Sequence, residues 1–173
     1  VIRDVRVLGR APVLDRHSSD LWVWESSNGR DYVIQGTWRS DGHAYVWDVT
    51  NPGNIVMVDS VQVDARTVND VKVSEDGNLA VISREGASNR QNGVILLDVS
   101  DPSNVIEVSS FSDELTGGVH NTFLYENNLY ALSAGRRYDV INVAEPGLPF
   151  RIGQFELDTP GHSIHDVWVD DGI

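Results

Sequence analysis

Two histidines and a carboxylate near the end of the sequence have a spacing typical of metal ligands. His162 and His165 are separated by two residues, Asp166 follows directly, and His120 begins an earlier segment of similar sequence. Two imidazoles and a carboxylate can bind zinc or iron where they converge, and an imidazole can also act as a general acid or base. These four residues define one candidate site, for a divalent metal ion or for acid–base chemistry.

The same histidines also have a structural interpretation. His120 and His165 belong to a set of polar residues that recurs along the chain. The set consists of the pairs Ser19-Asp20, Asn69-Asp70, His120-Asn121 and His165-Asp166. The residue type changes from one copy to the next, and buried polar groups are usually hydrogen-bonded to backbone. We therefore predict that these groups bond the backbone of neighbouring units. On this interpretation there is no catalytic residue and no cofactor, and the metal site is the alternative.

Short β-strands are the elements that must position these groups. Runs of β-branched and aromatic residues, such as 21–24, 32–34, 44–47, 79–82 and 94–97, alternate with Asn-Gly and Asp-Gly pairs. These pairs tolerate the positive φ of tight hairpin turns. No window of 11 residues shows apolar side chains at helical spacing. The pattern predicts an all-β chain of hairpin-connected strands.

A repeat of 44 to 51 residues organises these strands. Asp48, Asp98 and Asn142 end similar strands and lie 50 and 44 residues apart. Four strands per repeat of this length are typical of a β-propeller blade. We expect whole blades at residues 19–68, 69–119 and 120–164, an outer strand of a preceding blade at 1–18 and the start of a fourth blade at 165–173. In the second unit the strands should lie near 70–74, 79–84, 93–99 and 105–111.

Propellers usually close with about 4–8 blades. Residues 1–173 should therefore be an incomplete view of one propeller domain of roughly 6–8 blades.

Each repeat carries the same turn after its third strand. A polar residue stands four positions before a proline in each case: Asp48 before Pro52, Asp98 before Pro102, and Asn142 before Pro146. Proline cannot donate to a strand ladder, and a short polar side chain can accept hydrogen bonds from nearby backbone amides. We assign these residues a structural role in the turn.

The composition excludes several classes of protein. The formal net charge is -13, which argues against binding to nucleic acid or to anionic lipid. The absence of cysteine excludes disulfide scaffolds and thiol catalysis, and no apolar run approaches the ~20 residues of a transmembrane helix.

Four of the tryptophans lie in the first unit. We expect them to pack between blades, and the alternative is a carbohydrate-stacking or partner surface formed by Trp22, Trp24, Trp38 and Trp47.

The strand and turn of residues 95–102, together with the segment from His165 to Val169, resemble the LVIVD repeat of exported bacterial proteins. The resemblance covers residues 19–173, although Asn142 and Ala144 replace the usual Asp and Ser in the third unit. It implies a β-propeller that is secreted or attached to the cell surface. It implies no defined activity and supplies no catalytic residue.

Two functions from different classes follow as hypotheses. The first is an exported, non-enzymatic scaffold or binding module for a protein or cell-surface polymer, located outside the cell, in the periplasm or at the cell surface. The second is a propeller enzyme with a metal ion or an acid–base pair at the tunnel mouth around His120, His162 and His165.

Overall fold

All regular secondary structure in this computed structural model is β-strand; it describes residues 6–13 and 15–171. The first six strands are β1 (His17–Glu25), β2 (Asp31–Trp38), β3 (His43–Asp48), β4 (Val56–Gln62), β5 (Val71–Val73) and β6 (Leu79–Arg84). The next six are β7 (Gly93–Asp98), β8 (Ile106–Phe111), β9 (Val119–Tyr125), β10 (Asn128–Ser133), β11 (Arg137–Asn142) and β12 (Phe150–Glu156). The described residues include no helix that could cross a membrane.

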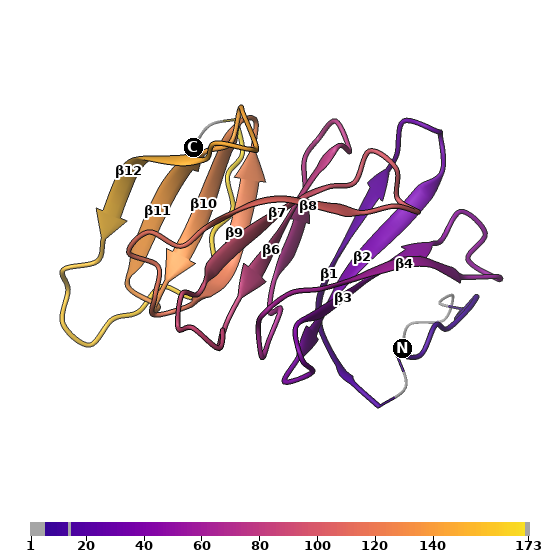
Figure 1. Cartoon of the computed structure of the whole chain (residues 1–173), viewed down its shortest axis with the longest axis horizontal. Helices are drawn as coiled ribbons and strands as arrows, with labels where there is room; N and C mark the ends of the chain where they lie inside the picture. Colours follow the sequence, from indigo (N-terminus) through magenta and orange to yellow (C-terminus); the bar gives the residue numbers. More distant parts are fainter. Residues whose placement is uncertain (1–5, 14, 172–173) are drawn as a thin grey trace.

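The strands form three antiparallel sheets of four consecutive strands, β1–β4, β5–β8 and β9–β12. The sheets stand side by side in the order of the sequence (Figure 1), and we call them the first, second and third blade. This arrangement confirms the predicted fold of four-stranded antiparallel blades. Strands β5 to β8 begin and end within one residue of their predicted bounds.

Each blade has two ends because its strands run up and down in turn. One end carries the first-to-second and third-to-fourth turns of every blade, and we call it the turn face. The opposite end carries the second-to-third turns and the connections between blades, and we call it the mouth face. Loops from neighbouring blades therefore meet at each face, where they can form a common surface.

The second blade is apolar at successive positions of β6 and β7 because both of its faces are covered. One set of its side chains packs against the first blade: Ala80, Ile82, Ile95 and Leu97. The alternate set packs against the third blade: Val81, Val94 and Leu96. Side chains alternate between the two faces of a strand, so each core receives every second residue. The two cores lie between blades rather than within one sheet.

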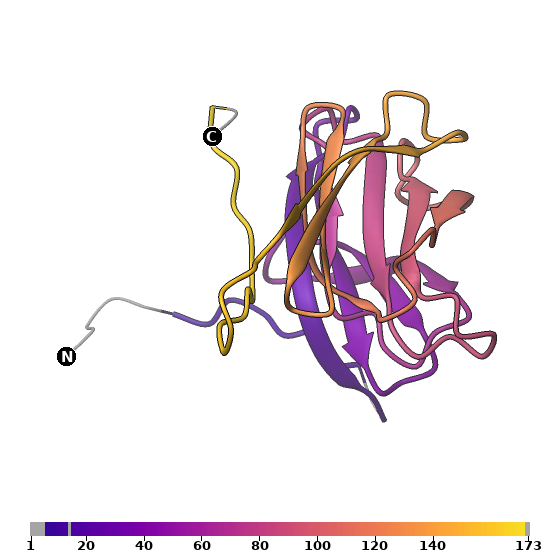
Figure 2. The same cartoon turned by 90° about the vertical axis from the view of Figure 1, so that its left-hand side faces the viewer.

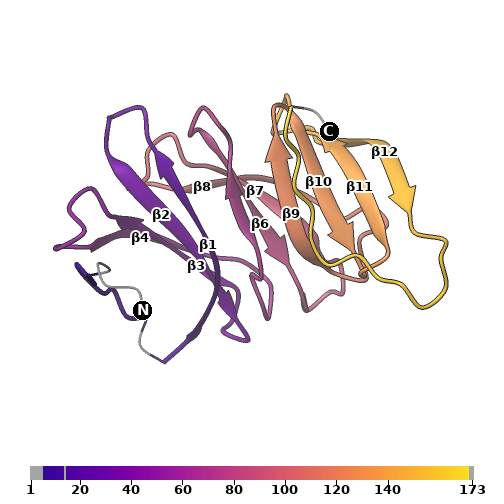
Figure 3. The ribbon, with the colours of Figure 1, turned by 180° about the vertical axis from the view of Figure 1, so that it is seen from behind.

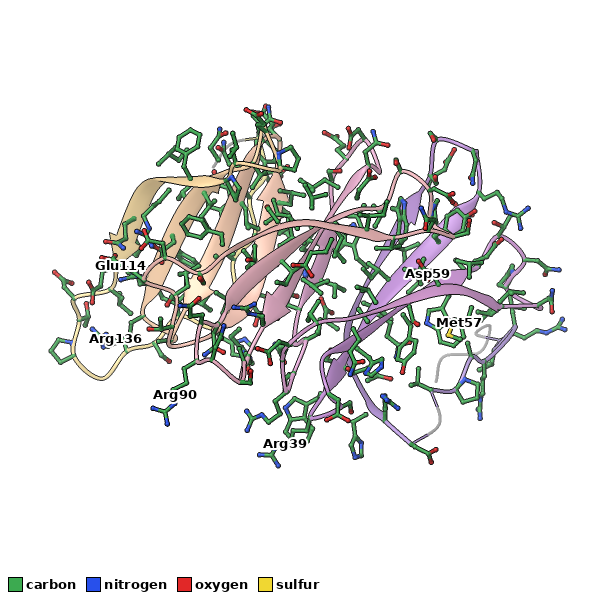
Figure 4. All side chains as sticks on the ribbon, viewed as in Figure 1. Arg39, Met57, Asp59, Arg90, Glu114 and Arg136 are labelled. Atoms are coloured by element: carbon green, nitrogen blue, oxygen red, sulfur yellow. The ribbon has the colours of Figure 1, made fainter. Side chains whose placement is uncertain are left out.

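Hydrogen bonds join the outer strands of adjacent blades. Asp59 of β4, labelled in Figure 4, accepts a bond of 2.7 Å from the backbone amide of Val105, just before β8. The hydroxyl of Ser109 on β8 donates a bond of 2.5 Å to the carbonyl oxygen of Pro146, just before β12. Each junction is therefore held at its outer rim as well as by its apolar core.

The turn after the third strand of each blade has the predicted hydrogen bonds. The amide of Thr50 donates to Asp48 at 3.0 Å, that of Ser100 to Asp98 at 2.9 Å, and that of Ala144 to Asn142 at 3.2 Å. The prolines Pro52, Pro102 and Pro146 lie beyond the strand ends, where no ladder bond is needed. Asn142 thus makes the same turn bond as the two aspartates.

The segments that flank the three blades differ from the predicted strands. Residues 6–13 form no strand, and residues 1–5 and 14 of the predicted outer strand lie outside the described residues. Residues 162–171 also form no strand, although they run beside the third blade (Figures 2 and 3). A strand needs a partner for its backbone groups, and the strands of the described residues pair only within their own three sheets. Residues 172–173 lie outside the described part.

The two outward faces of the blade row expose apolar side chains. On the first blade, Leu21, Val23 and Met57 are 51–57% exposed. On the third blade, Ile152 and Phe155 are 52–56% exposed. Along β1 the exposed Leu21 and Val23 alternate with the less exposed Trp22 and Trp24, as expected for a blade that has a neighbour on one side only.

Candidate functional site

Polar residues at the starts of the inner strands bond the adjacent blade on the mouth face. The Ser19 hydroxyl donates to the carbonyl oxygen of Val68 at 2.5 Å, and the Asn69 amide donates to that of His120 at 2.9 Å. For Ser19 and Asn69 these contacts agree with the structural interpretation, whereas the imidazole of His120 meets the Glu85 side chain and not a backbone group. They hold the inner strands of successive blades close together at this face.

A cavity of about 420 Å³ opens on the mouth face between the second and third blades. Its wall includes Arg66, Glu85, His120 and His165. His120 Nδ1 lies 3.1 Å from Glu85 Oε1, and the centres of the His120 and His165 rings are 5.2 Å apart. A carboxylate that bonds one imidazole nitrogen fixes the orientation of the ring. His120 and Glu85 can therefore hold or transfer a proton, and the cavity beside them is large enough for a small ligand.

The convergence of His120, His162, His165 and Asp166 that the alternative metal site requires is not found among the described residues. His162 and Asp166 do not line the cavity that His120 and His165 share. In residues 6–13 and 15–171 no three His, Asp or Glu side chains are arranged to hold a metal ion. The reason is geometric: residues 162–169 are not helical, and side chains three positions apart on an extended chain start about 10 Å apart.

A cluster of charged side chains that the sequence did not reveal joins all three blades. Lys72 Nζ lies 2.5 Å from Asp70 Oδ1 and 3.0 Å from Asp20 Oδ2. The second carboxylate oxygen of Asp70 accepts bonds from the amide and hydroxyl of Thr122 at 2.5 and 2.7 Å. The Lys72–Asp20 and Thr122–Asp70 hydrogen bonds each join residues that are 52 positions apart in the sequence. Asp70 is therefore central to the packing of the inner strands.

Burial sets the protonation behaviour of this cluster. Loss of hydration, together with the hydrogen bond to Asp20, raises the pKa of Asp70 to about 7 despite the nearby ammonium. For Lys72, burial opposes the charge, but Asp70 and Asp20 outweigh it and raise the pKa. For Asp20, burial is outweighed by bonds from Asp70 and Lys72, and the pKa is lowered. The two carboxyl groups therefore titrate as an interacting pair rather than independently.

One sequence signal could have identified the cluster. Lys72 is the only lysine, and in the repeat it occupies the position of Trp22, Phe123 and Trp168. Lys72 Nζ is 5.1 Å from the Trp22 ring centre. The aromatic rings also contact one another, because the Phe123 ring is 6.4 Å from Trp22 and 4.7 Å from Trp168. A lone cation at an aromatic repeat position requires nearby carboxylates if it is buried.

The tryptophans of the first unit divide into two groups. Trp24 is buried and Trp22 packs against the same core between the first and second blades, as predicted. Trp47 and Trp38 do not lie between the described blades. Trp47 is on the outward face, where its indole donates to Gln35, and Trp38 is 42% exposed beneath the Arg39 guanidinium. Successive side chains of a strand point to opposite faces of the sheet. Because Val46 of β3 is buried against the second blade, the next residue, Trp47, faces outward.

A larger groove of about 820 Å³ lies on the turn face, between the second and third blades. Residues of four turns and of strand β8 line it, and we call it the inter-blade groove. Its apolar lining includes Leu79, Val108 and Val143, and four carboxylates also line it: Glu75, Asp76, Asp98 and Glu126. The groove is not visible in the sequence, because its residues come from turns that are far apart in the chain.

No protein-family model and no curated protein matches this chain. The resemblance to the LVIVD repeat therefore stays a prediction. Solved structures do match. One is a 6-phosphogluconolactonase-like protein from Bacteroides uniformis, with a TM-score of 0.67 and 19% identity over 83% of this chain and 42% of its own. A similar protein from Bacteroides fragilis has a TM-score of 0.66 and 16% identity over 82% of this chain and 39% of its own.

A hypothetical selenium-binding protein from Sulfolobus tokodaii matches with a TM-score of 0.65 and 15% identity, over 84% of this chain and 42% of its own. The chain thus spans less than half the length of the structures that it matches. At these identities the likeness concerns the fold alone. The described residues therefore have the fold of a β-propeller, of which they form three blades.

Proposed function

We propose that the chain is a non-enzymatic binding module and that the inter-blade groove receives a segment of a macromolecular partner. The observation that carries the proposal is the groove itself, which has a volume of about 820 Å³ and is lined by both apolar and polar residues. Such concave surfaces at the junction of two rigid units are typical binding sites. The apolar core and the Ser109–Pro146 bond hold its two walls together.

Location outside the cytoplasm, and a protein or cell-surface polymer as partner, belong to the same proposal. Their support is the resemblance to exported LVIVD-repeat proteins. Fractionation of the native cells, with an antibody against this chain, tests the location. Detection in the cytoplasmic fraction alone would contradict it.

A second candidate function is acid–base catalysis in the mouth-face cavity. The specific observation in its favour is the His120–Glu85 contact of 3.1 Å, with His165 beside it. A histidine oriented by a carboxylate can activate water as a general base. Two of the matching structures are called 6-phosphogluconolactonase-like, so hydrolysis of a lactone is the first reaction to assay.

One pair of variants separates the two candidates. Ala144→Trp places a large ring in the inter-blade groove, whereas His120→Gln removes the imidazole from the cavity on the opposite face. The purified chain is immobilised, envelope extract is applied, and each retained protein is purified and tested again by direct binding. We expect Ala144→Trp to abolish direct binding and His120→Gln to leave it unchanged. Loss of binding with His120→Gln alone, or of a lactonase activity with His120→Gln, would favour the cavity instead.

A further inference from the structure

The chemistry of the inter-blade groove specifies its partner more narrowly than its shape does. Among the residues that line it, four carry carboxylates and none is a lysine or arginine. The charge is therefore not compensated within the groove. A ligand that fills it without cations would leave these carboxylates partly desolvated and unpaired, which is costly.

Two of the four carboxylates are available to a ligand. Asp76 accepts bonds within its own turn from the Ser74 hydroxyl at 2.6 Å and from the Asn78 amides at 2.9 and 3.1 Å. Asp98 accepts the amide of Ser100. Glu75 and Glu126 are exposed, and neither accepts a hydrogen bond from the described part of the chain. They come from the first turns of the second and third blades and so belong to opposite walls of the groove.

Tyr125 lies in the negative surroundings that these carboxylates create. Loss of hydration raises the pKa of the Tyr125 phenol, and the carboxylates of Glu126, Asp171 and Glu75 raise it further. The carboxylate of Asp170 adds to this effect. The negative potential therefore reaches beyond the groove wall.

The two faces of the molecule also differ in their arginines. Arg39, Arg90 and Arg136 belong to second-to-third turns and lie along the lower edge of Figure 4, at the mouth face. The turn-face loops of the second and third blades contain no arginine or lysine. A basic partner is thus attracted to these turn-face loops, because none of their own side chains is cationic.

We infer that the inter-blade groove binds a peptide segment of another protein that carries basic side chains on either side of an apolar one. The basic side chains pair with Glu75 and Glu126, and the apolar side chain packs on Leu79, Val108 and Val143. This inference rests on the proposed function, because it names the partner chemistry of the same groove.

The test uses a fluorescent peptide of alternating arginine and leucine, and a matched peptide with glutamate in place of arginine. Binding is followed by anisotropy at low salt. We expect the arginine peptide to bind and the glutamate peptide not to bind. The double variant Glu75→Gln/Glu126→Gln should weaken binding about tenfold, because two charged pairs are lost. Circular dichroism shows whether the variant keeps its fold.

The control is Glu107→Gln/Glu156→Gln, which changes the net charge equally. Both glutamates are exposed on outer strands, and neither lines the groove. It should weaken binding less than about twofold. Equal losses in the two double variants would show attraction to net charge alone and would overturn the inference. If the arginine peptide does not bind but Ala144→Trp still abolishes binding of the native partner, the groove is the binding site and its basic partner chemistry is wrong. If both results are negative, the proposed function fails as well.

Discussion

Single carboxylates do three different tasks in this molecule, and burial separates them. Asp98 is partly exposed and closes a local turn through the Ser100 amide. Asp70 is 1% exposed and connects the second blade to the third through Thr122. Glu126 is exposed and accepts no hydrogen bond from the described residues. The first two stabilise the fold, and the third remains available for binding.

Replacing Asp98 with alanine removes the acceptor of the turn amide. We expect Asp98→Ala to lower the free energy of unfolding by about 1 kcal/mol, the usual net value of such a bond. Urea denaturation measures the change. Glu107→Ala serves as the control, since its side chain is exposed on β8. If both variants lose the same stability, the turn bond does not contribute.

The raised pKa of Asp70 makes stability depend on pH in an unusual direction. The folded state keeps the proton up to a pKa of about 7, whereas the unfolded chain releases it near 3.8. The folded form therefore binds more protons between these values, and this group's contribution is complete below pH 3.8 and lost as the pH rises to about 7.

Asp70→Asn should remove this dependence, because its amide is neutral at every pH. We expect the wild-type free energy of unfolding to fall by an amount on the order of 2 kcal/mol between about pH 5 and pH 8, relative to Asp70→Asn. Urea denaturation at both pH values measures the difference. The groups with lowered pKa, such as Asp64 and Asp76, are ionised throughout this range and cancel in the comparison. A parallel pH profile for the two proteins would contradict the assignment.

Middle and outer strands of a blade should contribute unequally to the free energy of unfolding. The middle strands β6 and β7 are buried on both faces, whereas β12 is an outer strand with alternate side chains in solvent. Leu96 of β7 is fully buried between the second and third blades, and Ile152 of β12 is 52% exposed. The same truncation should therefore have unequal effects at these two positions.

We expect Leu96→Ala to cost about 3 kcal/mol of stability, from lost transfer energy and the cavity left behind. Ile152→Ala should cost less than about 1 kcal/mol, because its side chain is half in water already. Thermal or urea unfolding of the two variants tests the comparison. Similar losses would mean that the face carrying Ile152 is covered in solution.

Elements that local sequence determines were predictable, and those that depend on a distant partner were not. Asp76-Gly77 separates β5 from β6, Asn92-Gly93 separates β6 from β7, and the turn with Pro102 separates β7 from β8, so these bounds were accurate. A strand at residues 1–18 or 165–173 required a neighbour that the described residues do not supply. The tie between Asp70 and Thr122 joins residues 52 apart and depends on how one blade packs on the next. His165, but not His162, reaches the cavity for a similar reason: the path of residues 162–169 beside the third blade decides it.

For the whole molecule, the net charge and the exposed apolar surface have opposite effects on association between copies of the chain. The two outward faces expose Leu21, Val23, Ile152 and Phe155, which favours contact between copies. The net charge of -13 disfavours it through long-range repulsion. Salt screens the repulsion but not the hydrophobic attraction.

Self-association should therefore increase with ionic strength. We expect static light scattering to give a larger mean mass at about 0.5 M salt than at about 0.02 M. The variant Leu21→Lys/Ile152→Lys should reduce the increase, since it places charges on both outward faces. A mean mass that is constant or falls with salt would indicate that charged contacts, rather than apolar faces, bring the copies together.

The Ser109–Pro146 bond has a consequence for the speed of partner binding. Val108 and Pro146 line the inter-blade groove, so this bond fixes the distance between its walls before any partner arrives. The site does not have to open, and association requires no slow conformational step. The observed association rate should rise linearly with partner concentration and reach no plateau. In Ser109→Ala the walls lose this connection, so complexes should dissociate faster while the association rate changes little.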